Sequence, residues 1–170
     1  MKNMKKNKHN LPLLNKNIVI TRSKDKISEV RSLFQNKGAK VFDLPALIMV
    51  YPDNLQPLDD ALKEINQFNW IIFSSSNGIT FVENRLRKDG LSLKNFSKSL
   101  NIGVIGEKTS KTLNDLGIKA DYIPPNFIAE SLIANFPISL DSARILLPRV
   151  QSGGRNVIAE EFKSSGAFVL

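Results

Sequence analysis

The sequence predicts a parallel α/β fold, in which short buried strands alternate with amphipathic helices. Two observations support this class. From Asn17 onward, apolar runs of two to four residues alternate with longer stretches that carry apolar residues at helical spacing. A strand–helix–strand pattern also occurs twice, once near each end of the chain.

The first half of the sequence predicts three strands and two helices. They are a strand at 18–20, a helix with apolar residues from Ile27 to Phe34 that Gly38 ends, a strand beginning at 41–42, a helix from Leu58 to Ile65, and a strand at 70–73. The second strand closes before Pro45, because proline cannot donate to a sheet ladder. The strand at 70–73 is apolar throughout, as expected for a strand buried on both faces.

The second half continues the alternation. Its predicted elements are a helix with apolar residues at 79–86, a strand at 102–105, a helix at 109–116, a short strand at 121–123, a helix from Ile128 to Phe136, a strand at 145–147, a helix at 157–162 and a last strand at 168–170. Glycine stands after three of these helices, at 90, 117 and 166, where a helix commonly ends.

An internal repeat relates residues 18–41 to residues 145–169. In both copies an arginine, Arg22 or Arg149, stands two residues after the strand, and a Gly-Ala pair precedes the second strand. Any two strand–helix–strand units share a similar skeleton through common helix-ending chemistry. The match of both features, with one residue of slippage, favours duplication.

The composition excludes several kinds of chemistry. The 170 residues are 42% hydrophobic and 24% charged, which is typical of a globular protein with a core. The sequence has no cysteine, which excludes disulfides, thiolate metal sites and a cysteine nucleophile, and favours the reducing cytoplasm. His9 is the only histidine and lies in the amino-terminal segment, so we expect no imidazole catalysis and no metal site. No apolar run is long enough to cross a bilayer.

The net charge of +8 is concentrated at the amino terminus. Residues 1–16 carry five of the 24 basic residues and no acidic residue, which leaves 19 basic against 16 acidic residues in the remainder. A lysine-rich terminus is typical of a solvated, flexible tail. We therefore expect no membrane partner and no nucleic-acid partner. If the tail did bind nucleic acid, the affinity would fall steeply as the salt concentration rises.

Polar residues collect where the predicted strands run into helices. They form the turns at 21–23, 74–78, 106–109 and 124–126 and the pair at 148–149. In an open parallel sheet, ligands bind at the carboxyl ends of the strands. Helix N-termini there offer unpaired N–H groups and a positive dipole end. The turns therefore predict a site for a ligand with many carboxylates or phosphates.

Each candidate residue also has a purely structural interpretation. The residues at 75–77 and Thr109 are typical helix N-caps. Arg22 and Arg149 are compatible with ordinary surface charges or with solvated ion pairs that contribute little. The glycines at 103–106 do not make a dinucleotide-binding fingerprint, because the third glycine is missing.

Five sequence blocks, taken in order, resemble the uroporphyrinogen-III synthase family. The blocks lie at 19–22, 44–45, 70–78, 102–109 followed by 116–117, and 146–149. No single block is specific, so the resemblance depends on their succession. It implies two flavodoxin-like α/β domains joined by a two-stranded connector, with the first domain built from both ends of the chain. On this basis residues 1–16 are a basic flexible tail, 17–47 open a first domain whose remainder is missing, and 48–170 form the second domain with the connector strands.

The resemblance also implies an activity and a site. Members of the family are lyases that cyclise hydroxymethylbilane to uroporphyrinogen III, with inversion of the last pyrrole ring and loss of water, without cofactor or metal. Thr109 would be the catalytic residue, and backbone amides of the two turns would share in binding. The substrate carboxylates would be bound by Ser74, Ser75, Ser76, Asn77, Gly78 and Lys108, and by Arg22 and Arg149. The protein is expected to be a cytoplasmic monomer, and this 170-residue chain to be inactive by itself.

In a second interpretation the protein has the same fold but no catalytic activity, and is a flavodoxin-like binding or regulatory module. A phosphoacceptor receiver domain would need acidic residues after its first strand and an aspartate after a central strand. The residues at 21–22 and 74–75 are Thr-Arg and Ser-Ser instead. Isomer analysis of the porphyrins formed from hydroxymethylbilane distinguishes the enzyme from the binding module.

Overall fold

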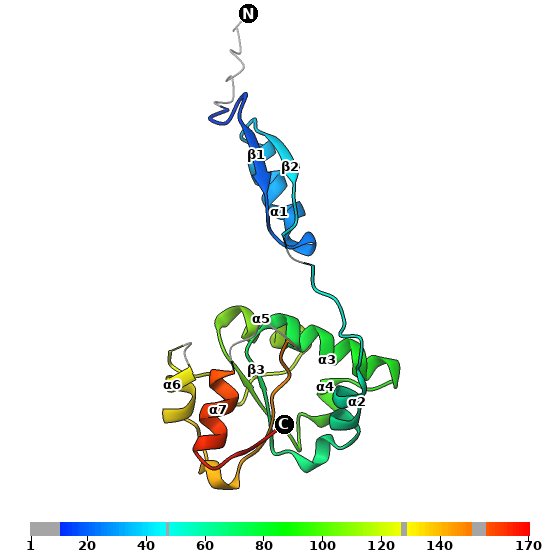
Figure 1. Ribbon diagram of the computed structural model, residues 1–170, viewed down its shortest axis with the longest axis vertical. Helices are drawn as coiled ribbons and strands as arrows, with labels where there is room; N and C mark the ends of the chain where they lie inside the picture. The colour runs from blue at the N-terminus through cyan, green and yellow to red at the C-terminus, as the bar shows by residue number, and fades with distance from the viewer. Residues whose placement is uncertain (1–10, 47, 127–128, 151–155) are drawn as a thin grey trace, which may run out of the picture. The chain divides into compact units, whose positions relative to one another are not determined.

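The computed structural model describes residues 11–46, 48–126, 129–150 and 156–170 (Figure 1). The chain divides into two compact units, Met1–Tyr51 (unit 1) and Pro52–Leu170 (unit 2). Most of the tail predicted to be flexible falls on residues 1–10, outside the described ranges, as does Ile128, the predicted start of a helix. The predicted domain limits at 47 and 48 and the connector strands stay predictions.

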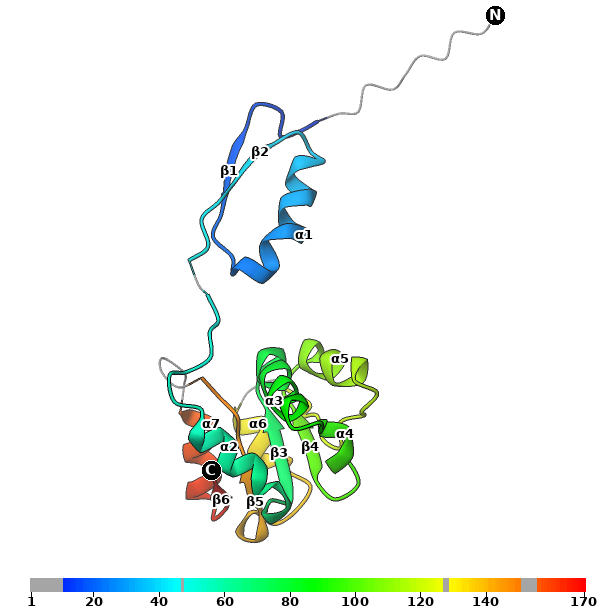
Figure 2. The ribbon, with the colours of Figure 1, turned by 90° about the vertical axis from the view of Figure 1, so that its right-hand side faces the viewer.

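Unit 1 is a single strand–helix–strand element. β1 (Asn17–Ile20) and β2 (Lys40–Asp43) pair in parallel, and α1 (Lys24–Gln35) connects them and covers one face of the pair (Figure 2). Ile20, Ile27 and Ala39 are buried in this contact. Alternate strand residues point to opposite faces, and Val19 and Phe42 are accordingly exposed.

Unit 2 contains a four-stranded sheet in the order β4-β3-β5-β6, with all pairs parallel. Its elements are α2 (Gln56–Lys63), the 3-10 turn η1 (Ile65–Gln67), β3 (Trp70–Phe73), α3 (Ser76–Lys88), α4 (Leu93–Phe96), β4 (Asn101–Val104), α5 (Glu107–Asp115), α6 (Ala129–Ala134), the 3-10 turn η2 (Leu140–Ser142), β5 (Arg144–Leu146), α7 (Val157–Ser164) and β6 (Phe168–Val169). The predicted parallel α/β class is confirmed.

The core of unit 2 lies on both faces of the sheet. All four residues of β3 are buried, because helices cover both sides of this central strand. Ile71 and Phe73 pack into a cluster with α2, α3 and α5, whereas Trp70 and Ile72 pack into a second cluster with α6 and α7. Figure 1 shows α6 and α7 on one side of the sheet and α2, α3 and α4 on the other.

Asn69 fixes the position of β5 beside β3 at the end where both strands begin. Its Nδ2 donates to the carbonyl of Ser142 at 3.1 Å, and its Oδ1 accepts from the backbone N–H of Arg144 at 2.8 Å. Its backbone carbonyl also accepts from the N–H of Asn101, at the start of β4, at 3.0 Å. Because three strands begin together around Asn69, their carboxyl ends meet at one edge of the sheet.

One ion pair and one buried carboxylate anchor α3, the helix that follows β3. The guanidinium of Arg85 donates two hydrogen bonds to the carboxylate of Asp59 on α2, and these bonds hold the pKa of Asp59 below its usual value. Glu83 is 3% exposed and accepts from Arg87 Nε at 2.9 Å and from the backbone N–H of Leu93 at 3.0 Å. Helix α3 is therefore fixed to both α2 and α4.

The structure differs from the sequence prediction at two places in unit 2. The short strand predicted at 121–123 is wrong, because Tyr122 makes only an isolated parallel bridge with Gly103 and Pro124 follows, which cannot extend a ladder. The short helix α4 was not predicted. It begins after Ser92, whose side chain and backbone form a capping box with Asn95.

The two copies of the internal repeat have the same structure. Both fold into parallel strand–helix–strand units, β1-α1-β2 and β5-α7-β6, whose strands are direct neighbours. Gly38 and Gly166 adopt similar positive φ angles, 91° and 96°, and the alanine after each glycine is buried. Within the described ranges, none of the helices combines the length and the apolar character needed to cross a membrane.

Candidate functional site

The candidate site is the edge of the unit 2 sheet where β3, β4 and β5 end. In the register of the sheet Phe73 lies opposite Val104, the last residues of β3 and β4. One step further, the backbone N–H of Ile105 donates to the carbonyl of Phe73 at 3.0 Å. The serine turn at 74–78 and the turn at 105–109 therefore leave the sheet side by side, and each leads into a helix.

Ser75 is the N-cap of α3. Its backbone is extended, and its Oγ accepts from the N–H of Gly78 at 3.3 Å, so the capping interpretation of this serine is confirmed. The N–H groups of Ser76 and Asn77 precede the first helical hydrogen bond and are left without a helical acceptor. The N–H of Gly78 is already taken by Ser75, which leaves Ser76 and Asn77 as the freer backbone donors. Ser74 is exposed at the tip of the turn.

The turn after β4 ends differently, because Gly106 is the N-cap of α5. Gly106 has a φ of 94°, which a residue with a side chain rarely adopts, and it offers no capping side chain. The first helical bond runs from Ser110 N–H to the Gly106 carbonyl at 3.0 Å. The N–H groups of Glu107, Lys108 and Thr109 therefore precede it and have no helical acceptor within this described segment.

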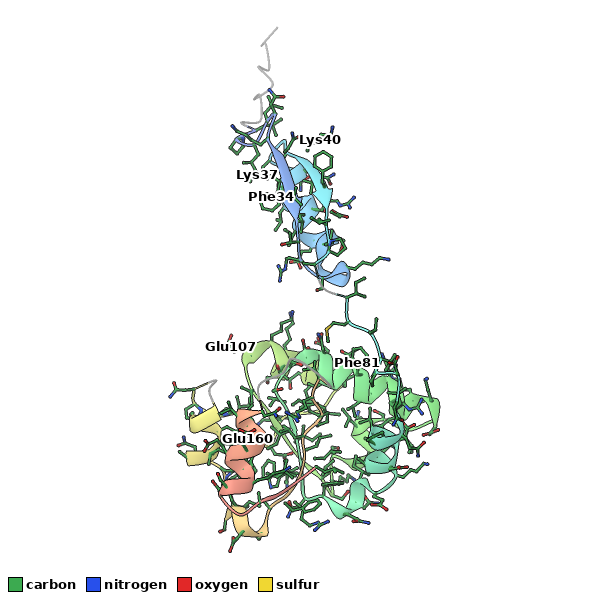
Figure 3. All side chains as sticks on the ribbon, in the orientation of Figure 1. Phe34, Lys37, Lys40, Phe81, Glu107 and Glu160 are labelled. Atoms are coloured by element: carbon green, nitrogen blue, oxygen red, sulfur yellow. The ribbon has the colours of Figure 1, made fainter. Side chains whose placement is uncertain are left out.

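Thr109 is the third residue of α5 and is 4% exposed, so the interpretation of Thr109 as an N-cap is wrong. The cap position is occupied by Gly106, three residues earlier. Lys108 and Glu107 are exposed. Figure 3 labels Glu107 at the start of α5. Its carboxylate was not among the predicted site residues, although the block at 106–109 contains it.

The chain leaving β5 passes against the first turn of α3. A Cβ placed on Gly78 would stand 3.6 Å from the carbonyl oxygen of Pro148 and 3.3 Å from the ring of Phe73. The exit of β5 therefore lies within van der Waals distance of the serine turn. Arg149 follows directly, is exposed, and donates from its guanidinium to the side-chain oxygen of Asn156, the N-cap of α7.

The structure thus brings the predicted unit 2 residues to one edge of one sheet. They are Ser74, Ser75, Ser76, Asn77, Gly78, Lys108, Thr109 and Arg149. Arg22 lies in unit 1, where it follows β1 and is exposed, and its part in the same site stays a prediction. The roles of all these residues in binding also stay predictions.

The chemistry available at this edge is hydrogen-bond donation. Two helix N-termini supply backbone donors and positive dipole ends, and Lys108 and Arg149 supply cationic side chains. Among the residues the structure describes, no cluster of three or more His, Cys, Asp or Glu side chains could hold a metal ion. The arrangement suits an anionic ligand with several carboxylates.

Comparison with known proteins gives consistent matches. A family model described as uroporphyrinogen-III synthase HemD matches residues 28–170. The chain is 39% identical over 159 residues to the uroporphyrinogen-III synthase of Synechococcus elongatus, and the match covers 94% of this chain and 60% of that relative. It is 28% identical over 116 residues to the porphyrin biosynthesis protein HemD of Ruminiclostridium josui, with 68% of this chain and 23% of that relative covered.

Solved structures show the same fold. A crystal structure of a mutant uroporphyrinogen III synthase from the extremely thermophilic bacterium Thermus thermophilus matches with a TM-score of 0.67 at 13% identity, covering 91% of this chain and 59% of that one. A second Thermus thermophilus uroporphyrinogen III synthase structure matches with a TM-score of 0.55 at 16% identity, covering 91% and 60%. The chain spans about 60% of the length of the first of the curated relatives. Because the family model matches most of the sequence, including the serine turn and the turn that contains Thr109, the chain belongs to the uroporphyrinogen-III synthase HemD family.

Proposed function

We propose that this chain is part of a uroporphyrinogen-III synthase, which cyclises hydroxymethylbilane to uroporphyrinogen III with inversion of the last pyrrole ring and loss of water. Family membership supports the reaction. The observation that carries the proposal is the hydrogen bond from Ile105 N–H to the Phe73 carbonyl, which sets the N-termini of α3 and α5 side by side. A linear tetrapyrrole carries carboxylate side chains along its whole length, and adjacent helix N-termini suit such a ligand.

The reaction places few demands on nucleophilic side chains. Ionisation of the terminal hydroxymethyl group releases water and gives an electrophilic azafulvene, which the last pyrrole ring attacks through its substituted carbon. The resulting spiro intermediate opens and closes again with that ring inverted. Free hydroxymethylbilane closes without inversion, so the protein must chiefly hold a flexible chain in one geometry and stabilise developing charge.

The residues at the carboxyl edge of the unit 2 sheet have different proposed roles in binding and catalysis. The free N–H groups of Ser76 and Asn77 on α3 and of Lys108 and Thr109 on α5 bind substrate carboxylates. The hydroxyl of Thr109, at the start of α5 and nearly buried, donates to the reacting part of the substrate. Lys108 adds positive potential. Ser74 and Arg149 extend the set of donors to carboxylates further along the substrate. Arg22, in unit 1, stays a predicted donor to carboxylates.

We also propose that the 170-residue chain alone has little or no activity. Unit 1 consists of two strands and one helix, and Val19 and Phe42 on the uncovered face of its sheet are 56% and 44% exposed. Parallel sheets in folded proteins are covered on both faces, and a unit of this size cannot bury a sufficient core by itself. The cysteine-free sequence supports a cytoplasmic location, and we propose a monomer.

Isomer analysis of the porphyrins formed from hydroxymethylbilane tests both statements. The assay compares this chain with a version extended beyond Leu170 by the corresponding part of the Synechococcus elongatus relative. The extended chain should produce the inverted isomer III, whereas the 170 residues alone should leave the uninverted product of spontaneous closure. A folded extended chain that yields only the uninverted isomer would refute the enzyme and favour a binding module. Abundant isomer III from the short chain would refute only the proposed inactivity.

A further inference from the structure

The starts of the two strands of unit 1 carry only basic charges, whereas the opposite end carries acidic residues together with Arg22, Lys24 and Arg31. Lys16, Lys37 and Lys40 are exposed around the starts of β1 and β2, and Figure 3 labels Lys37 and Lys40 at that end. The sequence contains no acidic residue at 1–24 or at 30–42. The acidic residues of unit 1 occur only in the first half of α1 and at the end of β2. Because α1 runs back along the strands, these acids lie toward the opposite end of the unit.

Two exposed leucines accompany these lysines. The segment at 11–16 is held against the start of β2, because Leu13 N–H donates to the Lys37 carbonyl and Lys40 N–H donates to the Lys16 carbonyl, both at 2.9 Å. In this fixed turn Leu11 is 38% exposed and Leu14 is 57% exposed. We call Leu11, Leu14, Lys16, Lys37 and Lys40 the amino edge of unit 1.

The three lysines are available to an external anion. The ion pairs found in the described ranges of the chain involve none of them. Lys40 Nζ lies 5.2 Å from the centroid of the exposed Phe42 ring. Because the ring has no net charge, it does not neutralise the charge of Lys40. The sequence places four more lysines, and again no acid, within the first ten residues.

We propose that the amino edge of unit 1 binds the surface of an anionic lipid membrane. Lysines near such a surface are each attracted to the lipid headgroups, and their contributions accumulate. Exposed apolar side chains next to the lysines enter the boundary between headgroups and acyl chains. Nucleic acid would use the lysines but offers no apolar layer for Leu11 and Leu14. This changes the expectation from the sequence, which assigned the basic tail no membrane partner.

Vesicle sedimentation tests the proposal with the chain extended beyond Leu170 as described above, because unit 1 of the 170-residue chain alone cannot bury a sufficient core. The chain should sediment with phosphatidylcholine vesicles that contain phosphatidylserine and not with phosphatidylcholine alone, and high salt should release it. The triple variant Lys16→Gln, Lys37→Gln, Lys40→Gln should bind at least about tenfold more weakly. The matched control Lys98→Gln, Lys111→Gln, Lys119→Gln removes the same charge from exposed positions of unit 2 and should bind like the parent chain.

A second variant separates lipid binding from simple charge attraction. Leu11→Ser with Leu14→Ser keeps every charge and should weaken vesicle binding about fivefold, while binding of duplex DNA stays unchanged. Circular dichroism confirms that each variant is folded. The proposal is overturned if the leucine variant binds vesicles like the parent chain, or if the control triple variant loses as much affinity as the amino-edge variant. Tighter binding to duplex DNA than to the anionic vesicles would also overturn it.

Discussion

Replacing Thr109 with valine in the extended chain should slow formation of uroporphyrinogen III by about a hundredfold, the usual effect of removing one donor from a charge-stabilising site. Valine keeps the shape of threonine, so the nearly buried position stays packed and the unfolding transition should not move. The measurement is the rate of isomer III formation from hydroxymethylbilane at saturating substrate, with thermal unfolding recorded in parallel.

Two further variants define what the Thr109 result means. Thr109→Ser keeps a hydroxyl and should retain most of the activity. Thr112→Val removes a hydroxyl one turn later on the same helix, where Oγ1 donates to the Lys108 carbonyl at 3.1 Å, and should leave the rate nearly unchanged. If Thr109→Val forms isomer III at the parent rate, Thr109 does not belong to the site.

Replacing Glu83 with alanine should lower the free energy of unfolding of unit 2 by about 2 to 3 kcal/mol, because it leaves a buried donor without a partner. The Glu83 carboxylate accepts from Leu93 N–H at 3.0 Å and from Ser92 Oγ at 3.2 Å, at the point where α4 begins. Urea unfolding followed by the fluorescence of Trp70, the only tryptophan, reports on this unit directly. Glu161→Ala, at an exposed glutamate of α7, is the charge-matched control and should cost little.

The contribution of Glu83 should also depend on pH. Burial raises the pKa of its carboxyl, but the hydrogen bonds from Leu93, Arg87 and Ser92 outweigh burial and lower the pKa below its ordinary value of 4.5. The folded state therefore binds the proton less readily than the unfolded state. The stabilisation by the charged form is complete above about pH 4.5 and is lost as the pH falls through the lower pKa of the folded state. A stability difference between the parent chain and Glu83→Gln that stays constant down to pH 3 (about one and a half units below that value) would contradict this account.

Local pattern was sufficient to predict the elements that carry the candidate site. The strand at 70–73 is apolar at every position, and a central strand covered by helices on both faces requires that. Residues 75–77 are all candidate caps by residue type, because short polar side chains before a helix can accept from its first turn, and Ser75 is the one that does so, from Gly78. Parallel pairing then places the ends of β3, β4 and β5 together without further information.

The remaining features depend on contacts between residues far apart in the sequence. Thr109 has the chemistry of a cap, but Gly106 takes that position because the chain leaves β4 with a positive φ. The burial of Glu83 is visible only when α4 is folded against α3, and no sequence pattern marks a charged residue for burial. The approach of the chain after β5 to Gly78 joins segments some seventy residues apart, which no local pattern shows.

We propose that free backbone donors at the carboxyl edge of the unit 2 sheet hold a polycarboxylate tetrapyrrole. An NMR titration of the 15N-labelled chain with uroporphyrin III, a stable relative of the proposed product, tests this most directly. The largest amide shifts in unit 2 should fall on Ser76, Asn77, Lys108 and Thr109. Largest shifts at the opposite edge, around Asn69 where the strands begin, would contradict it.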